Sequence, residues 1–260
     1  MDDQHRILSA WLQESLAFGV EHLFRAEATA SADREVAEPA VADAKVGRAT
    51  LDSVQRPLDS REPESALREG TGDAFEALNE MIARCRACSL CESRTQTVPG
   101  EGSPTARIMF VGEAPGHDED VTGRPFVGKA GQLLTKMIEA MGLRREDVFI
   151  ANVLKCRPPN NRDPSPEEAE QCLPFLRKQY SLLAPSVVVA LGAHAMRALV
   201  PSSTTLSSMR GKVHSLGRSK LVVTYHPSYL LRTPSEKPKA WDDLKLAMVE
   251  LGLPVPGRGA

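Results

Sequence analysis

The five cysteines of this 260-residue chain are the residues with the most specific chemistry. Two residues separate Cys85 from Cys88, and Cys156 and Cys172 follow much later. An odd number of cysteines, in a chain whose start does not read as a secretory signal, argues against a disulfide framework. Thiolates in such sets bind zinc or a [4Fe–4S] cluster, and spacing alone leaves both open. Cys91 repeats the two-residue spacing after Cys88 and competes as a ligand.

A second set of chemically active residues follows the apolar run Ile108–Val111. The segment Gly112–Asp120 combines a tight turn with four acidic side chains, the first of which is Glu113. A loop that cradles phosphate would not concentrate carboxylates, so a nucleotide site is excluded, whereas a solvated acidic turn is not. Phe126 then stands alone among turn residues in Gly123–Gly128, a pattern that fits a core residue or a stacking platform.

Two later apolar runs also end in polar residues. Asn152 lies near the end of the run 148–153, where a buried amide is costly without partners. Its donor and acceptor suit the edge of a base or the neighbouring backbone equally well. His226 is the first polar ring after the run 221–224, although a lone histidine there is more often structural. Arg232 follows six residues later, where it suits a phosphate contact.

The elements that must position these residues alternate between strands and helices. Apolar runs predict four strands, at 108–111, 148–153, 187–191 and 221–224. Helical spacing and end signals predict helices at 132–141, 166–183 and 241–251, with a short helix after Gly192. Continuous apolar strands between helices indicate a parallel sheet covered on both faces. We therefore expect an α/β fold, a three-layer α/β/α sandwich with a four-stranded parallel sheet and a ligand site beyond the carboxyl ends of the strands.

The first 70 residues differ from the rest in composition. Residues 5–25 have the spacing of an amphipathic helix, and residues 26–70 read as a flexible linker without aromatic side chains. We therefore expect a largely disordered extension at 1–70 and a working domain at 71–260. Gln13, Leu16 and Phe18 vaguely resemble a sliding-clamp motif, which would bring a replication or repair partner; simple packing of this helix is the plainer alternative.

Charge and hydropathy limit the kinds of molecule that the chain is expected to bind. Residues 1–70 carry 14 acidic and 8 basic side chains, which leaves 20 acidic and 24 basic in 71–260. This mildly basic body can bind nucleic acid, but an ordinary surface explains the balance as well. No apolar run approaches the ~20 residues of a membrane span, so we expect a cytoplasmic protein without a membrane partner.

Three motifs together resemble those of the family 4 (type A, iron–sulfur) uracil-DNA glycosylases. They are the segments Gly112–Gly128, Asn152–Arg162 and His226–Arg232, which occur in order and with fitting spacing. The resemblance covers about residues 75–251. It implies a [4Fe–4S] cluster, with zinc as the alternative, and leaves Cys91 outside the ligand pattern. The ligands it implies are Cys85, Cys88, Cys156 and Cys172.

The resemblance also implies a reaction. The enzyme flips uracil out of single- or double-stranded DNA and hydrolyses its N-glycosidic bond in base excision repair, releasing uracil and leaving an abasic site. Phe126 would stack on the base, the Asn152 amide would read its N3/O4 edge, and Glu119 would exclude the methyl group of thymine. His226 and backbone N–H groups at Ala114 would stabilise the uracil anion.

Further roles implied by the resemblance concern water and DNA. Glu113 is expected to place water and to counter the charge of the sugar, and the division of labour between Glu113 and Glu119 stays open. The basic segment Ser208–His214 contains Arg210 and Lys212, and these two residues and Arg232 are expected to contact phosphates of the DNA, bound by a monomer associated with the nucleoid. For Lys212, ordinary surface charge is an equal alternative. His117 and His194 are expected at surface or helix positions without a chemical role.

Three alternatives remain. A related protein that becomes covalently trapped on uracil-DNA carries a basic insert ending in histidine, which the segment Gly128–Leu143 lacks. A neighbouring glycosylase family with a broader range of bases generally lacks the acidic pair Glu113 and Glu119. A zinc-binding module without enzymatic activity would leave the three strand-end motifs unexplained.

Overall fold

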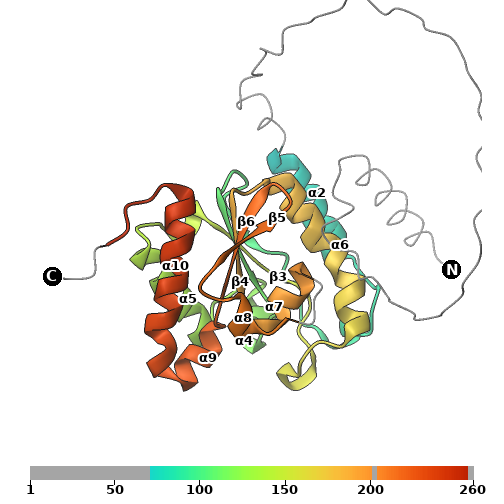
Figure 1. Ribbon diagram of the computed structural model, residues 1–260. Helices are drawn as coiled ribbons and strands as arrows, with labels where there is room; N and C mark the ends of the chain where they lie inside the picture. The colour runs from blue at the N-terminus through green and yellow to red at the C-terminus, as the bar shows by residue number, and fades with distance from the viewer. Residues whose placement is uncertain (1–70, 201–203, 257–260) are drawn as a thin grey trace, which may run out of the picture.

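The computed structural model describes residues 71–200 and 204–256, which form one mixed sheet with helices on both faces (Figure 1). The order of the six strands is β1-β3-β2-β4-β6-β5. Their bounds are β1 Glu101–Gly102, β2 Ile108–Gly112, β3 Phe149–Asn152, β4 Val187–Leu191, β5 Val213–Leu216 and β6 Ser219–Thr224. Strands β3, β2, β4 and β6 run parallel, and β1 and β5 pair antiparallel at the two edges.

The prediction of a four-stranded parallel sheet is therefore wrong in strand number, although its four strands are the parallel ones. Strand β1 has only two residues, Glu101 and Gly102, and shows no apolar pattern. Strand β5 overlaps the end of the basic segment Ser208–His214, and it carries His214 and Ser215. A hairpin turn at Gly217, with φ +55°, returns the chain into β6. Both edge strands lack the continuous apolar run that identifies a buried strand.

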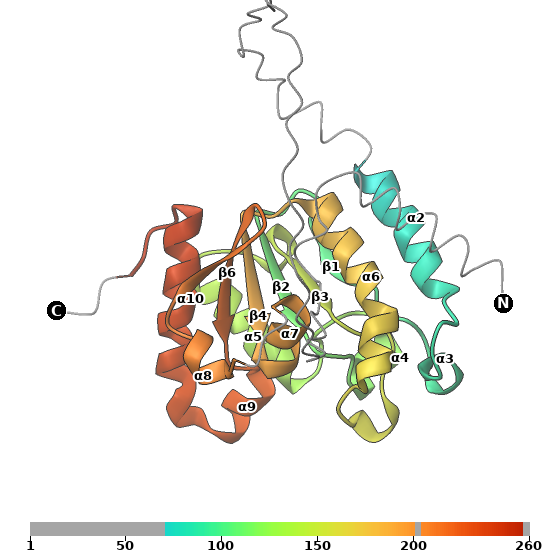
Figure 2. The same cartoon turned by 45° about the vertical axis from the view of Figure 1, so that its right-hand side comes forward.

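Side chains on opposite faces of the strands sort into two apolar cores. One core packs β2, β3, β4 and β6 against α2 (Thr71–Ala83), α6 (Pro166–Leu183), α7 (Gly192–Leu199) and α8 (Leu206–Met209). The other packs the same strands against α5 (Lys129–Ala140), α9 (Pro227–Arg232) and α10 (Lys237–Leu251). The two views show α6 and α10 on opposite sides of the sheet (Figures 1 and 2). Burial on both faces explains why all residues of β2, β3 and β4 are buried.

The predicted helices are present, and some of them begin at other residues than expected. Helix α6 has the expected bounds because Ser165 and Glu168 form a capping box and Pro166 occupies the first turn. Helix α10 begins at Lys237, four residues before the expected Trp241, because Pro238 in its first turn is compatible with a helix. The segment interpreted as an acidic turn folds in part into α4, His117–Thr122. A further short helix, α3, spans Leu90–Ser93.

The order of the parallel strands creates a crevice at their carboxyl ends. The chain leaves β2 towards α4 and α5, which leads to the face of the second core, and leaves β4 directly into α7 on the face of the first core. Neighbouring strands whose connections depart to opposite faces leave an opening between them. In both views α4, α7 and α9 gather at this same edge of the sheet (Figures 1 and 2).

Several expectations fall on residues outside this description. The amphipathic helix at 5–25, the linker at 26–70 and the domain boundary at residue 70 belong to the undescribed part of the chain. Among the described residues, no helix combines the length and the apolar character that crossing a bilayer requires.

Candidate active site

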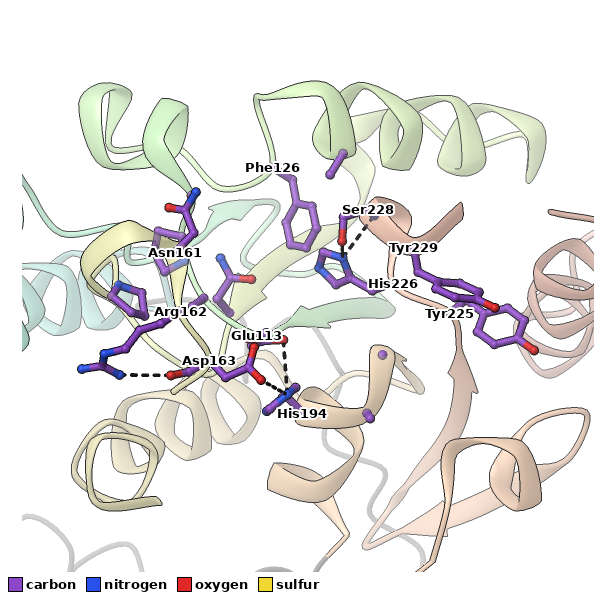
Figure 3. Close-up of a pocket in the computed structure, with 18 of the residues that line it drawn as sticks. Glu113, Phe126, Asn161, Arg162, Asp163, His194, Tyr225, His226, Ser228 and Tyr229 are labelled. Carbon is purple, nitrogen blue, oxygen red and sulfur yellow. Dashed lines mark hydrogen bonds and ion pairs between the residues drawn. The ribbon is translucent and has the colours of Figure 1, made fainter. Parts of the chain in front are cut away.

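A cavity of about 800 Å³ opens at the carboxyl edge of the parallel strands (Figure 3). It brings together residues from all three motifs singled out in the sequence. The predicted site residues among its lining are Glu113, Ala114, Glu119, Phe126, Asn152, His226 and Arg232. Arg210, Lys212 and the cysteines are not among its lining residues. The three strand-end loops therefore share one pocket.

The start of the first loop is shaped by a requirement for glycine. A Cβ atom at Gly112 would overlap the Asn152 side-chain oxygen and the ring of Phe126. Phe126 has φ +51°, a left-handed conformation that is costly for an aromatic residue. A Cβ at Gly131, in the first turn of α5, would overlap the Phe126 backbone. The strained turn thus persists because two glycines leave room for it, and it directs the Phe126 ring into the pocket.

The Glu119 carboxylate stabilises this turn by accepting hydrogen bonds from the backbone. Its Oε2 accepts a hydrogen bond from Gly116 N (3.0 Å), and its Oε1 accepts from Val127 N (2.9 Å) and Gly128 N (3.0 Å). Hydrogen bonds from backbone donors to a carboxylate are among the stronger ones in proteins. Glu119 therefore ties the loop after β2 to the turn that carries Phe126, while it also lines the cavity.

Asn152 ends β3 directly beside Gly112 in the parallel ladder. Its side chain is 1% exposed, and its Oδ1 has no hydrogen-bond partner among the described residues. Leaving a buried polar atom unpaired costs on the order of 1–3 kcal/mol. Such a cost is typical of a group that awaits a ligand, and Asn152 lines the cavity in which a ligand would supply the partner.

His226 caps the start of α9 with its own ring. Ser228 N donates to Nδ1 (3.2 Å), and the Ser228 hydroxyl also lies 2.7 Å from Nδ1. Because a backbone N–H can only donate, Nδ1 is the acceptor and the proton of the neutral ring sits on Nε2. Burial, with a smaller contribution from Arg232, lowers the pKa of His226 to about 4. The ring is therefore neutral at pH 7, and its Nε2–H is a donor without positive charge.

We call Phe126, Asn152 and His226 the neutral wall of the pocket. The Phe126 and His226 rings face each other in Figure 3, with centroids 5.7 Å apart and an interplanar angle of 36°. All three side chains are uncharged at pH 7, and Phe126 is only 6% exposed. They offer one aromatic face, one amide and one N–H donor, which is the set that a flat, uncharged heterocycle requires.

The opposite side carries Glu113, Asp163 and His194, which we call the charged wall. His194 Nε2 lies 4.0 Å from Glu113 Oε2 and 3.7 Å from Asp163 Oδ2. Figure 3 shows the three side chains pointing toward one another from the loop after β2, the segment before α6 and helix α7. Burial raises the pKa of Glu113, the nearby His194 lowers it, and Asp163 raises it again.

Sequence reasoning missed two members of the charged wall. His194 lies on a helix, as expected, but its ring faces the cavity. It follows Gly192 by two residues at the end of β4, so the strand-end rule, applied to all four parallel strands, would have found it. Asp163 lies in the long connection between β3 and α6, where no sequence signal distinguishes it from a surface carboxylate.

The three predicted phosphate contacts differ in their surroundings. The Arg210 guanidinium pairs with Asp243, at 2.6 and 2.8 Å, and stacks on Tyr225 with its carbon 3.8 Å from the ring centre. The side chains of Arg210 and Asp243 are only 10% and 1% exposed. Lys212 and Arg232 are exposed, and Arg232 lies at the pocket. The latter two are accessible to a phosphate, whereas Arg210 already has a buried partner.

All five cysteines line a second, small cavity between α2, α3, the segment after β3 and α6. Cys156 and Cys172 are buried, and none of the five is in a disulfide. Burial raises the pKa of Cys172 to about 12 and also raises that of Cys156. Hydrogen bonds nevertheless reach two sulfurs, from Arg94 Nη1 to Cys156 Sγ (3.1 Å) and from Lys155 N to Cys172 Sγ (3.2 Å).

The spacing of these thiols bears on which metal they fit. No three of them come within 4.8 Å of one another in the described part of the chain. A tetrahedral zinc ion with Zn–S bonds of about 2.3 Å would hold its sulfurs only ~4 Å apart. A [4Fe–4S] cluster carries its ligands on separate iron atoms and suits a wider set. The thiol donors that share this cavity are compatible with a [4Fe–4S] cluster.

Comparisons with known proteins agree with this geometry. The Uracil DNA glycosylase superfamily matches residues 99–245. A type-4 uracil-DNA glycosylase of Thermotoga maritima is 49% identical over 167 residues, 64% of this chain and 87% of the relative. One of Archaeoglobus fulgidus is 46% identical over 182 residues, 66% of this chain and 92% of the relative.

A type-5 uracil-DNA glycosylase of Pyrobaculum aerophilum is also similar, at 37% identity over 150 residues, 51% of this chain and 66% of the relative. The similarity to the two type-4 proteins is thus higher and extends over more of the chain. The matched region contains the pocket and both of its walls. This chain belongs to the uracil DNA glycosylase superfamily and, within it, to the type-4 uracil-DNA glycosylases.

Proposed function

We propose that the chain excises uracil from DNA in base excision repair, with the extruded nucleotide held between the neutral wall and the charged wall. The observation that carries the proposal is the shared cavity, in which the buried Asn152 oxygen lacks a partner beside Phe126 and His226. A base inside a duplex cannot reach such a pocket, so the nucleotide must flip out first.

The neutral wall suits uracil in particular. Phe126 offers its ring for stacking, and the Asn152 amide can accept from N3–H and donate to O4. Cytosine presents the opposite pattern on this edge, with an amino group and a bare N3. A bidentate contact of this kind is worth about 1–3 kcal/mol of discrimination. Glu119 contributes by fixing the turn that carries Phe126, and excluding the thymine methyl group is its proposed second role.

Cleavage of the C1′–N1 bond leaves its electron pair on uracil and a cation-like sugar. The neutral His226 ring can donate its Nε2–H to uracil O2, where negative charge develops, and backbone N–H groups at Glu113 and Ala114 can assist. A donor fixed before the reaction stabilises such charge without reorganisation. Because the pKa of His226 is about 4, the ring that meets uracil is neutral imidazole. The N–H of neutral imidazole is too weak an acid to protonate the uracil anion, so it acts as a hydrogen-bond donor and stays on the ring.

Glu113 is suited to the sugar side of the reaction. As a carboxylate it can face the cationic C1′ and hold the water that attacks it. The water adds its hydroxyl to C1′, and its proton leaves through Glu113 to solvent. The uracil anion takes up a proton from solvent after release, which balances the hydrolysis.

A [4Fe–4S] cluster on Cys85, Cys88, Cys156 and Cys172 would serve the architecture of this site. It would join the segment around α3 to the chain after β3 and to α6. Ala114, at the pocket, packs against the same apolar cluster as these cysteines. Asn152 lies four residues before Cys156, so a bound cluster would hold the strand end that carries the amide.

The activity can be tested on uracil-containing single- and double-stranded oligonucleotides, with alkali cleaving any abasic site. We expect cleavage at uracil and none at thymine or cytosine in matched oligonucleotides. An intact substrate after incubation with the brown, iron-containing protein would refute the proposal. A protein–DNA adduct that resists SDS would instead indicate the covalently trapped relative.

The cluster has a separate test. Protein purified anaerobically should be brown, absorb at the blue end of the visible range and contain iron. Cys156→Ala should lose colour and iron, whereas Cys91→Ala should keep both. A colourless, iron-free preparation containing zinc would refute the cluster, and loss of iron in Cys91→Ala would bring Cys91 into the ligand set.

A further inference from the structure

His194 has no part in the roles proposed so far, although its ring lies in the pocket. It is the third residue of α7, which begins immediately after β4 and faces the crevice between β2 and β4. One ring atom, Nε2, faces two carboxylates, Glu113 Oε2 at 4.0 Å and Asp163 Oδ2 at 3.7 Å. The His194 ring thus lies between the two carboxylates and is within ion-pair distance of both.

The backbone of Glu113 is held in place, but its side chain depends on His194 for an ion pair. Its backbone is fixed, because Leu154 N donates to the Glu113 carbonyl at 3.0 Å. Its side chain has one ion pair among the described residues, and that pair is with His194. Without this partner the partly buried carboxylate, 27% exposed, would face Asp163 alone. Rotation away from the sugar or uptake of a proton would then relieve the repulsion.

We propose that His194 is a positioning residue for the glycosylase reaction, which orients the Glu113 carboxylate toward the sugar and keeps it ionised, while Asp163 holds the His194 ring from the other side. This inference rests on the proposed role of Glu113. His194 does not touch the reacting atoms; it acts through Glu113. In the charged wall, one His194 ring thus pairs with two carboxylates. The Glu113 side chain is 27% exposed and the Asp163 side chain is 81% exposed.

Apart from the exposed Arg232, the other charged side chains that line the pocket are already engaged, and His226 stays neutral. Glu119 accepts from three backbone N–H groups, and Arg162 pairs with Glu168 at 2.6 Å. His226 is neutral at pH 7. Arg232 is exposed and contributes to the low pKa of His226. Among these groups His194 is the one that lies against Glu113 and lowers its pKa, so a change in the ionisation of Glu113 reports on His194.

The experiment compares pH–rate profiles of the full-length holoprotein and the variant His194→Asn on a uracil-containing oligonucleotide. Activity falls toward acid as Glu113 takes up a proton, and removing the nearby cation raises the pKa of Glu113. The acid limb of His194→Asn should therefore move upward by about half to one pH unit, which lowers activity on that limb by roughly 3- to 10-fold. KM should change by less than about twofold, because His194 does not face the base.

Three controls separate positioning from a merely structural role. His117→Asn makes the same chemical change at an exposed histidine and should leave the profile unchanged. His194→Lys restores a cation and should return the acid limb toward that of the wild type. Asp163→Asn removes a like charge near Glu113 and should move the limb slightly in the opposite direction.

The outcomes distinguish this inference from the proposed function. A wild-type profile in His194→Asn, with normal uracil release, would overturn the role of His194 and leave the glycosylase activity intact. A loss of rate that is equal at every pH, and that His194→Lys does not restore, would also overturn it, because it would indicate altered packing of α7. Absence of uracil release by the wild type would instead refute the proposed function.

Discussion

The two walls of the pocket differ in charge, burial and the way in which they are held. The neutral wall contains the nearly inaccessible Asn152 and Phe126, and a histidine whose pKa is lowered to about 4. The charged wall contains Glu113, His194 and Asp163, whose side chains are 27%, 35% and 81% exposed. The more accessible wall is thus the one that carries charge.

This difference follows from the cost of burying polar groups. A neutral amide or imidazole can be fully enclosed for a few kcal/mol, which a ligand's hydrogen bonds can offset. A carboxylate enclosed in the same way would take up a proton, so it stays near solvent and near a cation. The pocket can therefore recognise an uncharged base on one side and stabilise a cationic sugar on the other.

The largest expected effect is on the neutral wall. His226→Ala removes the proposed donor to uracil O2 and should lower kcat by roughly 10²–10³-fold, the usual effect of losing one fixed donor at an oxyanion. The oligonucleotide assay under saturating substrate measures it, with circular dichroism as the check on folding. Wild-type turnover in a folded His226→Ala protein would remove this residue from the mechanism.

The same histidine predicts a dependence of stability on pH. Its folded-state pKa is about 4, below the value near 6.5 of an unfolded chain, so the unfolded state binds more protons between these values. Stability should therefore rise with pH through this window and fall as the pH is lowered from about 6.5 to 4. Thermal melts across the window should show a shallower slope for His226→Ala. Equal slopes would contradict the neutral, enclosed ring.

The next effect in size concerns Asn152. Asn152→Ala should lower kcat/KM by roughly 5- to 160-fold, which corresponds to the 1–3 kcal/mol of a bidentate base contact. The melting temperature should change little, because Oδ1 has no partner among the described residues whose bond the substitution would break. A large loss of stability with full activity would reverse the interpretation and make Asn152 a structural residue.

Glu119 links the neutral wall to the loop after β2, and its substitution should act mainly through stability. Glu119→Gln replaces one carboxylate oxygen by an NH₂ group that cannot accept from the loop amides. We expect a loss of about 1.5–3 kcal/mol in the free energy of unfolding, measured by urea denaturation. Release of thymine by this variant would support the second role of Glu119, exclusion of the methyl group. If the variant releases no thymine, stabilising the loop is the role that remains for Glu119.

The sequence predicted the neutral wall better than the charged wall. Asn152 and His226 stand at or just after apolar runs, so their strand-end positions can be read from the sequence. Phe126 is the one aromatic residue among the turn residues Gly123–Gly128, which also marks it in the sequence. The pairing of Glu113 with Asp163 and His194 depends on how far α7 and the connection before α6 reach across the crevice. That reach is set by tertiary packing, for which a local pattern carries no signal.

The strands of the sheet also differ in whether the sequence predicts them. The four parallel strands have the continuous apolar runs that burial on both faces demands, and they were predicted. Strand β1 owes its existence to pairing with Phe149 and Ile150, and β5 to the hairpin with β6. Neither edge strand needs an apolar run of its own, since each is supported by the neighbour that it pairs with.

The smallest expected effect lies outside both walls, where DNA affinity rather than turnover is set. Lys212→Gln and Arg232→Gln each remove an exposed charge, and each should weaken binding and reduce the slope of log affinity against log salt by about 1 if it neutralises one phosphate. Arg210→Gln is the contrast, because its guanidinium is committed to Asp243 and Tyr225. Its effect should appear as lower thermal stability with an unchanged salt slope. Fluorescence anisotropy on an uncleavable oligonucleotide at several salt concentrations measures all three, and a reduced slope for Arg210→Gln would show that this buried pair opens to bind a phosphate.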